Sequence, residues 1–165
     1  TGEVMGIDYT FEAALAKALL AAGLMLPQQG AILLSIADRD KPESVPIIRK
    51  LAGIGYKLYA TEGTAAMIQA LNLPVTMISK KSEGHPNVLD LIRNREVNGV
   101  INTLTGGRIP LRDGFEIRRT ATERRIPCYT SLDTARAVVD MLVTTDRSYN
   151  VQPLQDYLEK RPEHK

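Results

Sequence analysis

The sequence predicts an α/β protein built in three layers, with a parallel five-stranded sheet and helices on both faces. Short apolar runs alternate with amphipathic helical patterns from residue 30 onward, and repeated βα units of this kind form parallel sheets with right-handed crossovers. The run over residues 99–104 is apolar almost throughout, as expected for a strand buried on both faces. With 165 residues, 44% of them hydrophobic, the chain suits one domain with additional segments at its ends.

An amphipathic helix precedes the sheet. Apolar side chains recur at helical spacing over residues 11–22, and Gly23 is a typical helix stop. The expected apolar face consists of Phe11, Leu15, Ala18, Leu19 and Ala22. We therefore expect residues 1–29 to form a linker and helix, residues 30–143 the main domain, and residues 144–165 a polar tail. A short apolar pattern in this tail, over residues 151–158, predicts that it packs on a neighbouring surface.

Strands and helices then follow in alternation. Strands are expected at residues 31–37, 56–60, 75–79, 99–104 and 128–131. The helix after the first strand opens at Asp40 and Glu43, which have the spacing of a capping box. Its expected buried face is Val45, Ile48, Leu51 and Ala52. Further helices are expected up to about residue 71, from Pro86, around residues 116–123 after a loop at 105–114, and over residues 135–142.

The composition excludes several classes of function. The net charge is only +2, and the chain has two Phe and no Trp, so neither nucleic acid nor an anionic membrane surface is an expected partner. Cys128 is the single cysteine, which rules out an intrachain disulfide and favours a reducing, cytoplasmic setting. We find no apolar run of about 20 residues and no signal peptide. Because residue 1 is Thr, we expect the chain to be a section of a longer protein.

The segment between the second strand and its helix predicts an anion-binding site. Thr61, Gly63 and Thr64 lie where an apolar strand breaks into a helix. Free backbone N–H groups, the positive end of the helix dipole and two hydroxyl groups can there face one ligand, and phosphate is the obvious candidate. The alternative is that Thr61 or Thr64 only caps the helix and that Gly63 only makes the turn.

Other polar residues follow the neighbouring strands, so we expect them at the same edge of the sheet. Lys41 and Lys80 offer mobile positive charges suited to phosphate, unless they are ordinary solvated lysines. Asn102, with Thr103 beside it, can both donate and accept hydrogen bonds, which suits a sugar or a base. For Arg118 and Arg119, an ion pair with Glu116, Glu123 or Asp113 is favoured over a phosphate clamp.

Catalytic and metal-binding patterns are missing from the sequence. Both histidines, His85 and His164, stand outside any cluster with metal-ligand spacing. Neither a nucleophile elbow nor a Gly-rich nucleotide motif occurs. We therefore expect no catalytic residue, no metal site and no cofactor within this chain.

Several stretches together resemble one family. They are Thr-Gly-Glu-Val-Met-Gly at 1–6, Gly-Tyr-Lys-Leu-Tyr-Ala-Thr-Glu-Gly-Thr at 55–64, Glu-Gly-His-Pro at 83–86, Val-Ile-Asn-Thr at 100–103 and Ile-Arg-Arg-Thr-Ala at 117–121. The chain resembles, over nearly its whole length, the C-terminal part of the large subunit of carbamoyl phosphate synthetase, whose allosteric domain has the methylglyoxal-synthase-like fold. The opening stretch is similar to the segment that links the second ATP-grasp half to this regulatory domain.

The resemblance implies a regulatory rather than a catalytic role. The parent makes carbamoyl phosphate from bicarbonate, glutamine and ATP, with Mg²⁺ or Mn²⁺, for arginine and pyrimidine synthesis. Its implied partners are the rest of the large subunit and a glutaminase small subunit, in an oligomer. In bacterial members the domain binds UMP or IMP. By position, the phosphate would lie on Lys41, Thr61, Gly63, Thr64 and Lys80, and the nucleoside beside Asn102, Thr103, Asp113 and Ile117. Ornithine, where it activates, would lie beside Tyr129 and Ser131.

The sequence departs from this pattern at three places. Leu104 occupies a position that is often a second Thr, the loop at 105–113 is one residue longer than expected, and Lys81 adds a charge. Two other functions are the alternatives. A methylglyoxal synthase, acting on dihydroxyacetone phosphate, needs an Asp base where this chain has residues 82–86, and a His near Pro110; only Asp113 has a counterpart. A purely structural or oligomerisation module would use the same edge only for packing.

Overall fold

The computed structural model describes residues 3–79, 84–103, 110–144 and 151–159. Its sheet has five parallel strands, as predicted, and their order is β3-β2-β1-β4-β5. The strands are β1 (Ala31–Ser35), β2 (Lys57–Ala60), β3 (Thr76–Met77), β4 (Gly99–Asn102) and β5 (Cys128–Tyr129). Because the chain first builds the sheet outward from β1 to β3 and then returns to place β4 on the other side of β1, the order of the strands reverses between β1 and β4.

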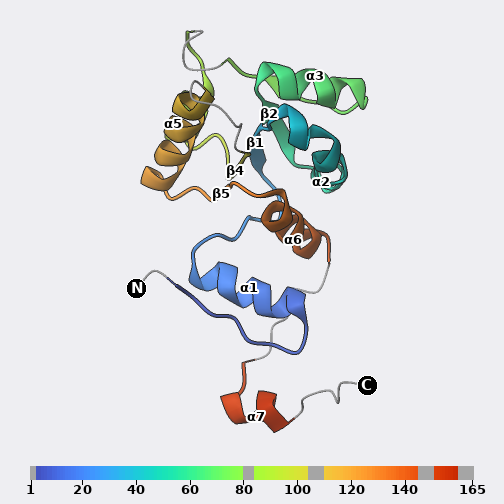
Figure 1. Ribbon diagram of the computed structural model, residues 1–165, viewed down its shortest axis with the longest axis vertical. Coiled ribbons are helices and arrows are strands. Elements are labelled where there is room, and N and C mark those ends of the chain that lie inside the picture. The colour runs from blue at the N-terminus through green and yellow to red at the C-terminus, as the bar shows by residue number, and fades with distance from the viewer. Residues whose placement is uncertain (1–2, 80–83, 104–109, 145–150, 160–165) are drawn as a thin grey trace.

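Helices cover both faces of the sheet (Figure 1). They are α1 (Phe11–Ala21), α2 (Lys41–Gly53), α3 (Glu62–Ala70), α4 (Val88–Arg93), α5 (Pro110–Glu123), α6 (Leu132–Val143) and α7 (Leu154–Glu159), with a short 3₁₀ helix η1 (Asp38–Asp40) before α2. Helices α2, α3 and α6 pack on one face of the sheet, and α4 and α5 pack on the other. The three-layer α/β prediction is therefore confirmed.

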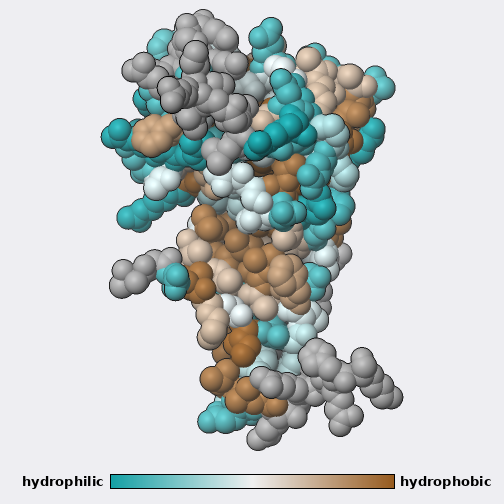
Figure 2. All heavy atoms as spheres, in the orientation of Figure 1, coloured by the Kyte–Doolittle hydropathy of each residue, from teal (hydrophilic) through white to brown (hydrophobic). Residues whose placement is uncertain are grey.

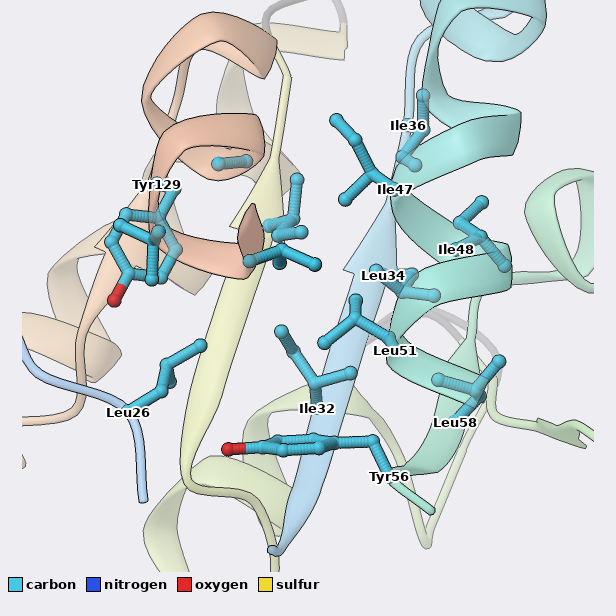
Figure 3. Close-up of a cluster of buried hydrophobic side chains, with 14 of the residues drawn as sticks. Leu26, Ile32, Leu34, Ile36, Ile47, Ile48, Leu51, Tyr56, Leu58 and Tyr129 are labelled. Carbon is cyan, nitrogen blue, oxygen red and sulfur yellow. The ribbon is translucent and has the colours of Figure 1, made fainter. Parts of the chain in front are cut away.

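Alternate side chains of β1 supply the two halves of the core. Ile32 and Leu34 face α2, α3 and α6, and Figure 3 shows them beside Ile47 and Leu51 of α2. Leu33, like Ala31, faces α4 and α5. Because β1 is buried on both faces, its run of apolar residues is explained by its central position in a parallel sheet.

Several local predictions are wrong. Asp40 forms no capping box, because η1 runs directly into α2 and leaves Asp40 in helical backbone geometry without a side-chain capping bond.

The buried residues of α2 are Ser44, Ile47, Ile48 and Leu51, whereas Val45 and Ala52 are half-buried. Helix α5 begins at Pro110, inside the expected loop. In α1, Leu19 is buried, but Phe11 is 69% exposed and Ala22 is also exposed.

The segment between α1 and β1 is fastened to the sheet. Leu26 is buried in the core, as Figure 3 shows. The Tyr56 hydroxyl donates to the Pro27 carbonyl at 2.5 Å, and the Tyr129 hydroxyl donates to the Leu24 carbonyl at 2.6 Å. Gly23 ends α1 with a φ of +67°, a conformation that glycine adopts without strain. Residues 24–27 are thus docked on the main domain.

Lys17 of α1 joins the N-terminal segment to α7. Its ammonium group lies 2.8 Å from an Asp8 carboxylate oxygen, donates to the Ile7 carbonyl at 2.8 Å and donates to the Tyr157 hydroxyl at 2.7 Å. Tyr157 is buried, and its ring centre lies 5.1 Å from that of Tyr9, with the two rings tilted by 45°. Part of the C-terminal region therefore packs on the N-terminal region through Tyr157. The other apolar residues of the expected pattern, Val151, Leu154 and Leu158, are exposed.

The pairing with Lys17 predicts a pH-dependent stability. The hydrogen bond from Lys17 lowers the pKa of Asp8, so the ion pair stabilises the fold above the unfolded-state pKa of about 4. That stability is lost as the pH falls through the folded-state pKa. We expect Asp8→Asn to lower the melting temperature at pH 7, with the difference from the original chain shrinking towards pH 3. Thermal unfolding across this range tests it, with the exposed Glu3→Gln as control; a constant difference would contradict the prediction.

Candidate anion-binding site

The carboxyl ends of β1 and β4 meet at the point where the strand order reverses. Ser35 and Asn102 lie opposite each other at these ends. The chain leaving β1 turns to α2 on one face of the sheet, and the chain leaving β4 leads to α5 on the other face. Such reversal points form crevices at the carboxyl edge of open α/β sheets. The residues that this edge brings together are those that the sequence placed after the strands.

Two threonine hydroxyls hold the chain as it leaves β1. The Ile36 N–H donates to Thr64 Oγ1 at 3.1 Å, and the Ala37 N–H donates to Thr103 Oγ1 at 2.8 Å. Both threonines are buried. Thr64 belongs to α3, which follows β2, and Thr103 follows β4, so these bonds tie β1 to the elements on both of its sides. The lone pairs that they use are no longer offered to a ligand.

Lys41 lies above the first turn of α3. A Cβ atom placed on Gly63 would stand 3.1 Å from Lys41 Nζ, so the absence of a side chain at residue 63 leaves room for the ammonium group. Lys41 Nζ also lies 2.6 Å from an Asp38 carboxylate oxygen, and the Lys41 side chain is 21% exposed. The prediction that Lys41 and Gly63 share a site is consistent with this geometry.

Thr61 precedes α3 without capping it. Its backbone is extended, but its side chain makes no capping hydrogen bond, and Thr64 bonds to Ile36 instead. The alternative in which one of these threonines only caps the helix is therefore not what the structure contains. The first N–H groups of a helix have no partner within the helix, and here they lie beside the Lys41 ammonium group, a combination that attracts anions.

Asn102 makes two hydrogen bonds from the end of β4. Its Nδ2 donates to the Ser35 carbonyl at 3.4 Å, and its Oδ1 accepts from Arg118 Nη1 of α5 at 2.8 Å. Asn102 is 3% exposed. The favoured ion-pair reading of the two arginines is confirmed for Arg119, which lies 2.8 Å from Glu123, and is wrong for Arg118, which binds Asn102.

The remaining predicted site residues lie in different parts of the fold. Asp113 is half-buried in the first turn of α5, and Ile117 is buried in the core beneath α4 and α5. The Tyr129 side chain lies in the other half of the core, where burial raises its pKa and its hydroxyl is bonded to Leu24. Ser131 caps α6 by accepting from the Asp133 N–H at 3.2 Å. Lys80, Lys81, Leu104 and the loop residues 105–109 lie outside the described residues.

The described polar groups of this edge mostly donate. The acceptor atoms of Thr64, Thr103 and Asn102 already take N–H groups of the protein. What remains is the Lys41 ammonium, the first N–H groups of α3 and the Thr103 hydroxyl proton, because the Thr64 hydroxyl donates to the Ile36 carbonyl at 3.5 Å. Cys128, half-buried on β5, adds no nucleophile, because burial raises its pKa to about 11. The arrangement suits the binding of an anion with several lone pairs.

Neither a metal-binding cluster nor a membrane-spanning helix is found in the part of the chain that the structure describes. Over these residues, His, Cys, Asp and Glu form no group of three that could hold a metal ion. None of the helices within the same residues is long and apolar enough to cross a membrane.

A parallel sheet whose strand order reverses, with helices on both faces, defines an open α/β domain. The chain belongs to the MGS-like domain family, whose model matches residues 43–130. The family that the sequence motifs indicated is thereby confirmed. The match spans β2 to β5 and contains most of the site described above.

Two curated proteins are similar in sequence to almost the whole of this chain. The carbamoyl phosphate synthase large chain of Thermomicrobium roseum is 52% identical over 158 residues, which are 95% of this chain and 15% of that protein. The C-terminal section of the carbamoyl phosphate synthase large chain of Methanopyrus kandleri is 46% identical over 94% of this chain and 29% of that protein. The chain thus spans less than a third of either relative.

A solved structure supports the fold. The crystal structure of methylglyoxal synthase from Elizabethkingia anophelis matches with a TM-score of 0.56 and 21% identity, over 84% of this chain and 97% of that one. At this identity the likeness concerns the fold alone, and it carries no activity to this chain.

The bond between Thr64 and Ile36 predicts a structural cost. Thr64→Val keeps the shape of the side chain but leaves the buried Ile36 N–H without its acceptor, which costs about 1–3 kcal/mol. Denaturant unfolding measures this loss. Thr122→Val is the matched control, because the Thr122 hydroxyl is exposed and bonds only to the Arg118 carbonyl; we expect a change within about 0.5 kcal/mol there. Equal losses in the free energy of unfolding of both variants would contradict the prediction that the buried Thr64 bond stabilises the fold more than the exposed Thr122 bond does.

Proposed function

We propose that this chain is the C-terminal regulatory section of a carbamoyl phosphate synthase large chain, and that it binds the phosphate of a nucleotide effector at the carboxyl edge of its sheet. The observation that carries the proposal is the position of Lys41 Nζ above Gly63 at the open first turn of α3. The names of two relatives that match 94–95% of the chain support the choice of parent protein. UMP is the proposed effector, with IMP as the alternative.

The proposed phosphate contacts come from Lys41, Lys80, the hydroxyl of Thr61 and the N–H groups at Gly63. Thr64 and Thr103 hold the frame of the site, since their acceptor atoms are engaged. The nucleoside would lie towards Asn102 and Asp113. Tyr129 and Ser131 remain proposed for ornithine, although both already make hydrogen bonds within the protein.

The activity belongs to the parent protein in this proposal. That protein would form carbamoyl phosphate from bicarbonate, glutamine and ATP with Mg²⁺ or Mn²⁺, in the cytoplasm, for arginine and pyrimidine synthesis, together with a glutaminase subunit. Figure 2 shows hydrophobic atoms gathered over the end of the molecule formed by α1 and α7, where Phe11, Leu20, Leu154 and Leu158 are exposed. We propose that the rest of the large chain covers this surface.

Regulation in this proposal is a coupling between two sites. A bound phosphate neutralises Lys41 and Lys80 and draws together the ends of β1 to β4. The strands and α1 are linked through Tyr56 and Tyr129, which bind residues 24–27. A change at the carboxyl edge would thus alter how α1 packs on the rest of the large chain. Couplings of this kind are typically about 1–3 kcal/mol.

Calorimetric titration with UMP tests the proposal. We expect UMP to bind more tightly than inorganic phosphate or uridine, and Lys41→Ala or Lys80→Ala to weaken it at least tenfold, because each removes a charge-assisted hydrogen bond. Lys57→Ala is the control, since Lys57 is exposed at the amino end of β2. Binding of IMP but not UMP would change the effector. Failure of UMP, IMP and phosphate to bind would contradict the proposed site.

The ion pair between Lys41 and Asp38 predicts a variant that binds more tightly. The Asp38 carboxylate competes with a ligand anion for the ammonium group, and the Asp38 side chain is 94% exposed. We expect Asp38→Asn to increase the affinity for UMP by up to about fivefold at low salt, and less at high salt. The exposed Glu96→Gln, in the loop before β4, controls for the change in net charge. An unchanged or weaker affinity in Asp38→Asn alone would argue that Lys41 does not contact the ligand.

A further inference from the structure

The amide group of Asn102 has one defined orientation. Arginine can only donate hydrogen bonds and a backbone carbonyl can only accept them. Arg118 Nη1 lies 2.8 Å from Oδ1, and the Ser35 carbonyl lies 3.4 Å from Nδ2. Both neighbours therefore require the same orientation, with the oxygen towards α5 and the nitrogen towards β1. Rotation of the amide by half a turn would place donor against donor at Arg118 and acceptor against acceptor at Ser35.

Gly114 makes this contact possible. Arg118 lies one helical turn after Gly114, and a long side chain on a helix leans towards the preceding turn. A Cβ atom on residue 114 would stand 3.0 Å from Arg118 Nη1 and 3.3 Å from Asn102 Oδ1. The backbone of α5 thus lies against the Asn102 oxygen on one side, while Arg118 occupies another. A ligand has little access to this oxygen.

Within the described residues, no acidic side chain holds Arg118. Among the described residues its hydrogen-bond partner is Asn102, and none of the ion pairs that these residues form includes it. Its neighbour Arg119 pairs with Glu123 on the same helix. The half-buried Arg118 guanidinium is therefore directed at the binding edge, whereas the exposed Arg119 stabilises the surface of α5.

We propose that Arg118 is a positioning residue that fixes the Asn102 amide, so that a ligand meets only its second N–H and must present a hydrogen-bond acceptor there. This inference rests on the proposed function, because it assigns the group that faces Asn102 in the nucleotide site. It replaces the expectation that Asn102 both donates and accepts. Carbonyl or sugar oxygens of a nucleoside fit this requirement, and an amino group does not.

The first test measures binding and separates orientation from charge. We expect Arg118→Met to weaken UMP about fivefold to tenfold, because one oriented hydrogen bond is lost. The affinity for inorganic phosphate should change less than twofold. Arg118→Lys should restore part of the UMP affinity, since one donor can still hold Oδ1. Arg119→Met is the matched control and should change neither ligand.

A second variant disturbs the contact between Arg118 and Asn102 without removing the arginine. Gly114→Ala favours the helix but displaces the Arg118 guanidinium, which is the movable group at this point. It should therefore lower the UMP affinity while the melting temperature stays the same or rises. Retention of full UMP affinity in both Arg118→Met and Gly114→Ala would overturn the proposal. Equal losses for UMP and phosphate would overturn it too, because Arg118 would then contact the anion itself.

A ligand-free measurement distinguishes this proposal from the proposed function. In ¹H–¹⁵N spectra of the free chain, the positions of the two Asn102 side-chain amide protons report the hydrogen bonds of that amide. Arg118→Met should shift them, and Arg119→Met should not. If UMP fails to bind the original chain but this shift occurs, the proposed function fails and the fixed amide stands. Unshifted amide protons in Arg118→Met would overturn the fixed amide whatever the ligand does.

Discussion

The two N–H groups that follow β1 govern the geometry of the site. Ile36 and Ala37 donate to Thr64 and Thr103, which come from the elements on either side of β1. These groups are buried at a strand end, where the sheet no longer supplies partners, and an unpaired buried N–H is costly. The threonine hydroxyls meet this need. They fix the separation of the β2 and β4 ends, and with it the position of Lys41 relative to Asn102.

Satisfying these backbone groups also sets the chemistry of the site. The side-chain oxygens of Thr64, Thr103 and Asn102 each accept an N–H group of the protein, although they lie on different elements. The Thr64 hydroxyl also donates to the Ile36 carbonyl at 3.5 Å, so both of its bonds are made within the protein. With these oxygens engaged, the described residues favour recognition of a ligand that carries lone pairs.

The sequence predicted the architecture well, because strand burial and helix periodicity are local signals. Strand-end residues such as Thr64 and Thr103 were found because parallel strands end at one edge. Their hydrogen-bond partners were not predicted, since these depend on β1 lying between β2 and β4. Asp40 was misread because a 3₁₀ turn can run directly into a helix. The contact of Arg118 with Asn102 had one signal in the sequence, a glycine one turn earlier in the same helix.

The contact between Lys17 and Tyr157 has a consequence for the order of folding. These residues are 140 positions apart, whereas each βα unit of the sheet closes a much shorter loop. Loop closure costs about 0.6 kcal/mol more for each doubling of length, so contacts within the sheet are favoured to form first. Helix α7 would then dock on a surface that already exists. We expect this junction to be the last part of the chain to assemble and the first to open.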